Sequence, residues 1–190
     1  NFSQSQLHQH NHWFRPHNDL FDTKAYWQKA FEVIDELISV LKPKRFFHIG
    51  MDEDHSRSYT QYVAAIRTLR DGLRKRGLTT MIWNDSACHW PAADIHREKS
   101  LYAETRIQKD IVQVLWNYWD VEAAAFRRIR RRGFALWGAP GGDPKQVRAT
   151  VKALKQCGAA GILLTRWAPC IPANRRSLLD HIGQLGPLCG

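Results

Sequence analysis

An adjacent pair of carboxylates, Asp52 and Glu53, follows a short apolar run and is the sharpest chemical feature of the sequence. Two such groups in one site suit glycosidic bond cleavage, because one can protonate the leaving oxygen while the other supports the cationic transition state. Neighbouring residues of a regular strand point to opposite faces, so the pair can serve one site only where the strand ends. Gly50 marks that place. A helix cap or a solvated acidic turn is the competing interpretation of the pair.

Tryptophans and polar residues also follow the other apolar runs. A lone tryptophan in such a place is more typical of a packed core than of a binding site. Four at matching places are harder to attribute to chance, and a flat aromatic face beside polar groups suits a sugar ring. The residues concerned are His48, Asp52, Glu53 and Asp54; Trp83, Asn84 and Asp85; Trp116, Asn117, Tyr118, Trp119 and Asp120; Trp137; and Arg166 and Trp167.

Helices and strands are expected to alternate along the chain. This order must bring together the polar and aromatic residues that follow the strands. Apolar spacings of three and four residues predict helices, and short continuous apolar runs predict buried strands. Asp22 is the expected N-cap of the first helix. Alternation predicts a parallel sheet, in which ligands lie outside the carboxyl ends of the strands. The expected helices cover residues 23–42, 58–76, 121–132, 143–157 and 175–182, and the expected strands cover 45–50, 79–83, 111–116, 134–138 and 161–165.

The run His48-Ile49-Gly50-Met51-Asp52-Glu53 resembles the His-x-Gly-Gly-Asp-Glu signature of glycoside hydrolase family 20, the β-N-acetylhexosaminidases. In that family the signature ends the fourth strand of a (β/α)8 barrel. Residues 81–85, 114–117, 136–139 and 161–167 are similar to the ends of the fifth to eighth strands. The resemblance therefore implies an α/β fold, a partial TIM (β/α)8 barrel with strands four to eight and their helices. Residues 23–190 would form this part, after an irregular His-rich segment at residues 1–22.

The resemblance implies a glycosidase that removes terminal β-linked N-acetylglucosamine or N-acetylgalactosamine by a substrate-assisted retaining mechanism. Glu53 would be the general acid and base, and Asp52 would stabilise the substrate's acetamido group. No cofactor and no metal are implied. The expected substrate-binding residues are His48, Trp83, Asp85, Trp116, Tyr118, Trp137 and Trp167.

The chain departs from the family pattern at three places. Met51 replaces the second glycine of the signature, which could alter the backbone or narrow the pocket. Residues 136–138 lack the tyrosine that commonly binds the acetamido oxygen, and Tyr118 is a candidate substitute. Trp167 has no nearby glutamate to hold the outer hydroxyls. These departures favour an alternative, a catalytically degenerate carbohydrate-binding protein on the same barrel.

Other classes of protein find less support. The formal charge of +10 and the arginines at 127, 128, 130, 131 and 132 raise nucleic acid as a partner, but such a run is more typical of a solvated helix face, and we expect no nucleic acid. No apolar run approaches the roughly 20 residues of a membrane span, so no membrane partner is expected. A metal-dependent hydrolase using the His8–His12 cluster is a further alternative. The four cysteines lack metal or redox spacing and favour an intracellular compartment.

The length of 190 residues is short for the fold that the motifs indicate. A complete (β/α)8 barrel takes roughly 250 residues. The sequence supplies five strand ends, so we expect the first three strands to be needed from elsewhere. A chain with two open sheet edges is expected to be poorly stable or inactive alone.

Overall fold

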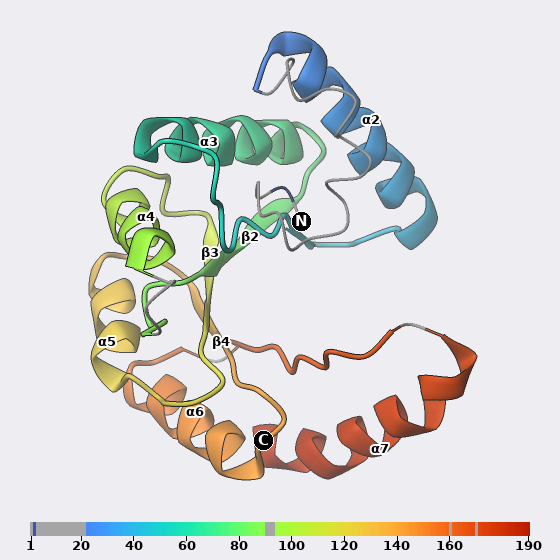
Figure 1. Cartoon of the computed structure of the whole chain (residues 1–190), viewed down its shortest axis with the longest axis vertical. Helices are drawn as coiled ribbons and strands as arrows, with labels where there is room; N and C mark the ends of the chain where they lie inside the picture. Colours follow the sequence, from blue (N-terminus) through green and yellow to red (C-terminus); the bar gives the residue numbers. More distant parts are fainter. Residues whose placement is uncertain (1, 3–21, 90–93, 160, 170) are drawn as a thin grey trace.

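In the described part of the chain, five parallel strands lie side by side in chain order, and the sheet that they form curls into a half-barrel (Figure 1). This computed structural model describes residues 2, 22–89, 94–159, 161–169 and 171–190. The strands are β1 (Phe46–His48), β2 (Thr79–Asn84), β3 (Val112–Trp116), β4 (Leu136–Ala139) and β5 (Gly161–Ile162). The predicted α/β alternation is therefore confirmed.

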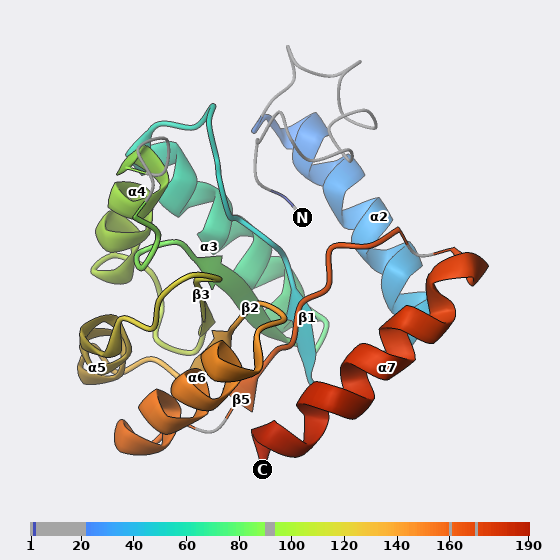
Figure 2. The ribbon, with the colours of Figure 1, turned by 60° about the horizontal axis from the view of Figure 1, so that its bottom comes forward.

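Helices form an arc around the outside of the sheet, as Figures 1 and 2 show. The arc begins with α2 before β1 and closes with α7 after β5. The helices are α2 (Lys24–Leu41), α3 (Tyr59–Lys75), α4 (Asp94–Glu104), α5 (Ala123–Arg131), α6 (Pro144–Gln156) and α7 (Arg175–Leu185), with 3-10 turns η3 (Pro172–Asn174) and η4 (Gly186–Cys189). None of the helices in the described part of the chain combines the length and apolar character of a membrane crossing.

Side chains at the helix starts explain where the helices begin. Ser58 and Gln61 form a reciprocal capping box at α3, and Asp143 caps α6 ahead of Pro144. The expectation that Asp22 caps α2 is wrong, because Thr23 is the N-cap and accepts the Tyr26 N–H at 3.4 Å. Asp22 adopts a φ of +56° and directs its carboxylate to an arginine instead.

The two faces of the sheet carry different apolar clusters, because alternate residues of a strand point to opposite sides. Ile82, Leu115 and Leu136 pack outward against the helices in the main core. Met81, Val114, Trp116 and Ala139 form a second cluster on the concave face. The strands are thus apolar on both faces, as parallel strands usually are. The concave cluster leads directly to the strand ends, where the candidate site lies.

The expected strand boundaries were less accurate than the order of the elements. The strand predicted over residues 161–165 ends at Ile162, although the Leu163 N–H still donates to the Gly138 carbonyl at 2.9 Å. Between β2 and β3 the structure has the 11-residue α4. Residues 1 and 3–21, which include the His8–His12 cluster, lie outside the described residues.

Candidate functional site

A cavity of about 360 Å³ lies at the carboxyl ends of the strands. It collects residues from the ends of β2 and β3 and from the segments after β1, β3 and β5, as expected for a parallel sheet. Most of its walls are residues that the sequence analysis selected. Thr165 was missed, and the only signal for it was its place in the same short segment as Trp167. The lining residues are Asp52, Glu53, Trp83, Trp116, Tyr118, Thr165, Arg166 and Trp167.

The loop after β1 explains how two adjacent carboxylates reach one cavity. Gly50, Met51 and Glu53 have φ angles of +82°, +75° and +49°. This left-handed path abolishes the strict alternation of a strand, so Asp52 and Glu53 both line the cavity. Such angles cost roughly 1–2 kcal/mol for each residue other than glycine. Contacts with the rest of the molecule must therefore hold the loop.

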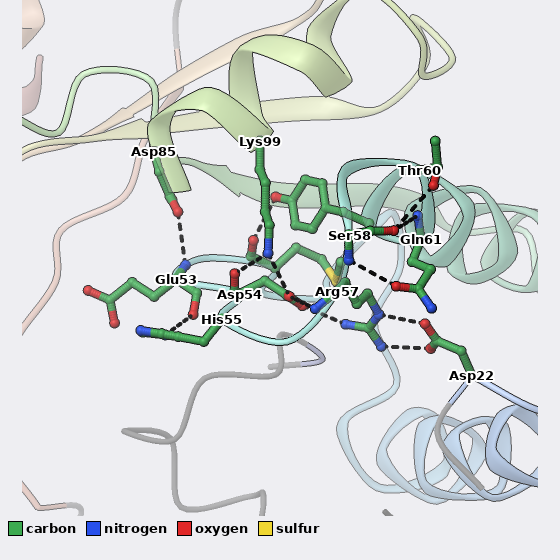
Figure 3. A network of polar contacts seen from close by, with 12 residues as sticks. Asp22, Glu53, Asp54, His55, Arg57, Ser58, Thr60, Gln61, Asp85 and Lys99 are labelled. Atoms are coloured by element: carbon green, nitrogen blue, oxygen red, sulfur yellow. Dashed lines mark hydrogen bonds and ion pairs between the residues drawn. The ribbon is translucent and has the colours of Figure 1, made fainter. Parts of the chain in front are cut away.

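Three hydrogen bonds from separate elements hold this loop. His48 Nδ1 accepts the Gly50 N–H at 3.0 Å. The Tyr62 hydroxyl, from α3, donates to the Met51 carbonyl at 2.7 Å. Asp85 Oδ2, from the end of β2, accepts the Glu53 N–H at 2.9 Å (Figure 3). The carboxylate pair is thus positioned by the ends of two strands and by one helix.

Met51 occupies a backbone conformation that favours glycine, which the signature has at this place. Its side chain is fully buried in the core between sheet and helices. It is not among the residues that line the cavity. The replacement therefore strains the backbone and fills the core, and it does not narrow the cavity.

Asp85 lies behind the cavity wall and is 2% exposed. Besides the Glu53 N–H, its carboxylate accepts the Trp116 indole N–H through Oδ1 at 2.7 Å. Its own N–H donates to Ser100 Oγ at 3.0 Å. Burial and the nearby charge of Asp52 raise the pKa of Asp85 well above its usual value, against the opposing effect of the two N–H donors. Asp85 was expected to touch substrate, but it is not among the residues lining the cavity.

Aromatic rings form a continuous wall on the β3 side. The rings of Trp116 and Tyr118 have their centroids 5.3 Å apart. The Trp167 indole N–H donates to the Tyr118 hydroxyl at 3.2 Å. Burial raises the pKa of Tyr118, so this phenol stays protonated at neutral pH. The wall therefore offers flat faces and one hydroxyl beside the carboxylates.

His48 lies beneath this site, with its ring centroid 4.4 Å from that of Trp83. Its pKa is lowered to about 4, chiefly by burial, while the charge of Asp52 acts in the opposite direction. The imidazole is therefore neutral near pH 7. Its Nδ1 accepts a backbone N–H, which agrees with a supporting role for this residue.

Trp137 lies apart from the other predicted residues. It stands in register with Val114 and Gly161, two residues before β4 ends. Its ring packs edge-on against Phe46, with centroids 5.5 Å apart, and covers Gly161 so closely that a Cβ there would meet it at 2.0 Å. It lines a second cavity, of about 410 Å³, and is absent from the lining of the first.

Asp54, next to the carboxylate pair, turns into the protein. It binds Arg57 Nη1 at 2.8 Å and Lys99 Nζ at 3.3 Å. Arg57 in turn binds both carboxylate oxygens of Asp22 at 2.9 Å (Figure 3). Burial lowers the pKa of Lys99 and the charge of Asp54 opposes this. The network ties the loop after β1 to α4 and to the start of α2.

The arginine run is only partly a solvated face. Arg128 and Arg132 bind the carboxylate of Glu104, which is fully buried at the end of α4. Arg130 donates to the carbonyl oxygens of Phe134 at 2.6 Å and Cys157 at 3.3 Å. These arginines therefore have structural partners that the sequence pattern did not reveal.

Among the described residues, no group of three or more histidine, cysteine, aspartate or glutamate side chains is arranged to hold a metal ion. The fold makes the chain an α/β protein built on a curled parallel half-barrel. No protein-family model matches the sequence, and no curated protein matches it.

Proposed function

We propose that the chain is the catalytic part of a glycoside hydrolase that removes terminal β-linked N-acetylhexosamine. The observation that carries this proposal is the shared cavity of Asp52 and Glu53, walled by Trp83, Trp116 and Trp167. Carboxylates supply acid–base chemistry, and indole faces stack on the C–H face of a sugar. The resemblance of residues 48–53 to the family 20 signature selects the N-acetylated sugars within this class.

In the proposed reaction the acetamido oxygen of the substrate attacks the anomeric carbon while Glu53 protonates the leaving oxygen. Asp52 accepts a hydrogen bond from the acetamido nitrogen and stabilises the positive charge of the cyclic intermediate. Glu53 then removes a proton from water, which opens the intermediate with net retention. Tyr118 lines the same cavity as Asp52 and Glu53, and its hydroxyl would donate to the acetamido oxygen.

A chromogenic N-acetylglucosaminide tests this function. We expect Glu53→Gln to lower kcat by about 10²–10⁴-fold, because the amide cannot donate the proton. Glu36→Gln is the matched control, since Glu36 is exposed on α2. Normal turnover by Glu53→Gln would refute the assigned mechanism.

A carbohydrate-binding protein without turnover is the second candidate. It is favoured by the absence of a tyrosine in residues 136–138 and by the non-glycine Met51 at a φ of +75°. Titration with N-acetylglucosamine, followed by the fluorescence of the eight tryptophans, measures binding separately from hydrolysis. Binding without turnover would favour this candidate, and Glu53-dependent hydrolysis would exclude it.

We propose further that three additional β/α units complete an eight-stranded barrel. β1 and β5 each have a pairing partner on one side only among the described strands, and unpaired parallel edges are unfavourable. Such units would also cover the concave face at Trp137. The assay should therefore compare the 190-residue chain with longer versions of it.

A further inference from the structure

One buried side chain, Asp85, connects the two sides of the cavity. One of its oxygens accepts the Glu53 N–H at 2.9 Å and the other accepts the Trp116 indole N–H at 2.7 Å. Glu53 follows β1 and Trp116 ends β3, while Asp85 follows β2, which lies between them. The middle strand thus holds the carboxylate loop on one side and an aromatic wall on the other.

Asp85 is badly placed to touch a ligand. It is 2% exposed and absent from the lining of the cavity. Both of its oxygens already accept hydrogen bonds, and its backbone N–H is bound by Ser100. In Figure 3 its carboxylate faces the Glu53 backbone, while the Glu53 side chain extends away from it.

Both partners of Asp85 are N–H donors, so the side chain must present an acceptor at each end. A carboxylate does this, whereas an asparagine amide has one acceptor and one donor end. An asparagine here can therefore satisfy Glu53 or Trp116, but not both. The contact with Glu53 matters most, because Glu53 has a φ of +49° and its direction depends on external support.

We propose that Asp85 is a positioning residue, which fixes the Glu53 backbone and the Trp116 indole relative to each other. Its effect on catalysis rests on the proposed function, since Glu53 is the assigned acid. The contact itself does not, because the two hydrogen bonds hold whatever the cavity binds. Small displacements of a catalytic group lower rates strongly, so loss of these two hydrogen bonds should reduce kcat.

The first arm of the test measures the contact without any substrate. Amide exchange and ¹⁵N NMR are recorded for the 190-residue chain and for Asp85→Asn and Asp85→Ala. We expect the Glu53 amide of Asp85→Ala to exchange at least about tenfold faster, and the Trp116 indole N–H resonance to move. Glu36→Gln is the control, because Glu36 is exposed on α2 and absent from the cavity lining. An unchanged Glu53 amide in Asp85→Ala overturns the proposal.

The second arm measures kcat and KM in whichever preparation hydrolyses the chromogenic substrate. We expect Asp85→Ala to lower kcat by about 10–100-fold. In a Trp116→Phe background the indole donor is gone, so Asp85→Asn can give its acceptor to Glu53. In that background the kcat of Asp85→Asn should stay within about threefold of the kcat of Trp116→Phe alone. A merely structural role does not predict this rescue. This comparison also carries the test if Asp85→Ala fails to fold.

The two arms separate the failure of this inference from failure of the proposed function. If no preparation hydrolyses the substrate, the proposed function fails and the amide exchange alone decides whether Asp85 positions Glu53. If hydrolysis occurs and Asp85→Ala leaves kcat within about twofold, the positioning role is overturned although the function stands.

Discussion

The indole N–H of Trp167 donates to the hydroxyl of Tyr118 at 3.2 Å and joins two wall segments that lie 49 residues apart. Trp167 is 76% exposed, so little packing holds its ring. Tyr118 is itself in contact with Trp116. The hydrogen bond therefore fixes an otherwise exposed aromatic face at the edge of the cavity.

Replacing Tyr118 by phenylalanine should weaken sugar binding while the ring stacking remains. Loss of one hydrogen bond, worth about 0.5–1.5 kcal/mol, predicts a rise in the dissociation constant of roughly 2–12-fold. Fluorescence titration with N-acetylglucosamine measures it. Tyr59→Phe is the matched control, because the Tyr59 hydroxyl donates to Glu98 and Tyr59 is absent from the cavity lining. Equal affinities of Tyr118→Phe and the parent would contradict the assigned role of the hydroxyl.

Arg57→Met should destabilise the fold strongly. The Arg57 side chain is fully buried, and its removal leaves Asp54 and Asp22 without their arginine partner. Breaking a buried pair in this way costs about 3–5 kcal/mol. Arg70→Met is the comparison, because Arg70 binds the exposed carboxylates of Asp71 and Asp110 and its loss should cost about 0–1 kcal/mol. Urea unfolding gives both values, and similar losses would argue against a central role for the buried network.

Met51→Gly should be more stable than Met51→Ala, by about 1 kcal/mol. Both variants lose the buried Met51 side chain beyond Cβ, which costs roughly 2–5 kcal/mol. Only glycine relieves the φ of +75°. Because Met51 does not line the cavity, KM should change little in either variant. The usual order, with alanine more stable than glycine, would show that the backbone is not strained at Met51.

The fold should lose stability as the pH falls from about 6.5 towards 4. The pKa values of His48 and His96 are each lowered to about 4, chiefly by burial. Between these limits the unfolded chain binds protons that the folded chain does not, so the free energy of unfolding decreases as the pH is lowered. Urea unfolding at pH 7.5 and pH 5 measures the fall. His96→Gln should reduce it, because it removes one of the two histidines with a lowered pKa. An identical fall in His96→Gln and the parent would rule out His96 as a source.

The 190-residue chain should self-associate through the helices at the two ends of the arc. Val40 and Leu41 of α2 are 73% and 68% exposed, and Ile182 of α7 is 59% exposed. Exposed apolar surface favours association when it lies beside strands that, like β1 and β5 among the described strands, pair on one side only. Val40→Lys with Ile182→Lys should lower the mean mass in sedimentation velocity. Ile95→Lys, on α4 away from both edges, is the control. A parent chain that stays monomeric at high concentration would contradict this expectation.

The order of helices and strands was predictable because it depends on local patterns. Ser58 and the pair Asp143-Pro144 start helices through contacts with residues a turn away. Much of the cavity lining was also predictable, since parallel strands present their ends at one edge. This position made Asp52 and Glu53 candidates, and the resemblance of residues 48–53 to a signature favoured them over a helix cap or a solvated turn.

The direction of individual side chains was decided by tertiary structure. Asp22 pairs with Arg57, 35 residues away, and leaves the capping to Thr23. Asp85 binds Glu53 and Trp116, each more than 30 residues away, and so faces away from the cavity. No local pattern encodes such partners, because they depend on strand register and on the φ angles of the loops.

The sequence by itself determined that helices and buried strands alternate, and that a carboxylate pair and tryptophans follow the strands. Only the tertiary structure decided which of these residues line one cavity. Trp137 lies apart because its register with Gly161 places it below the strand ends. Asp52 and Glu53 line the same cavity because a left-handed loop, held by Tyr62 and Asp85, removes the alternation of the strand. Local spacing sets the elements, whereas packing between distant elements sets the direction of each side chain.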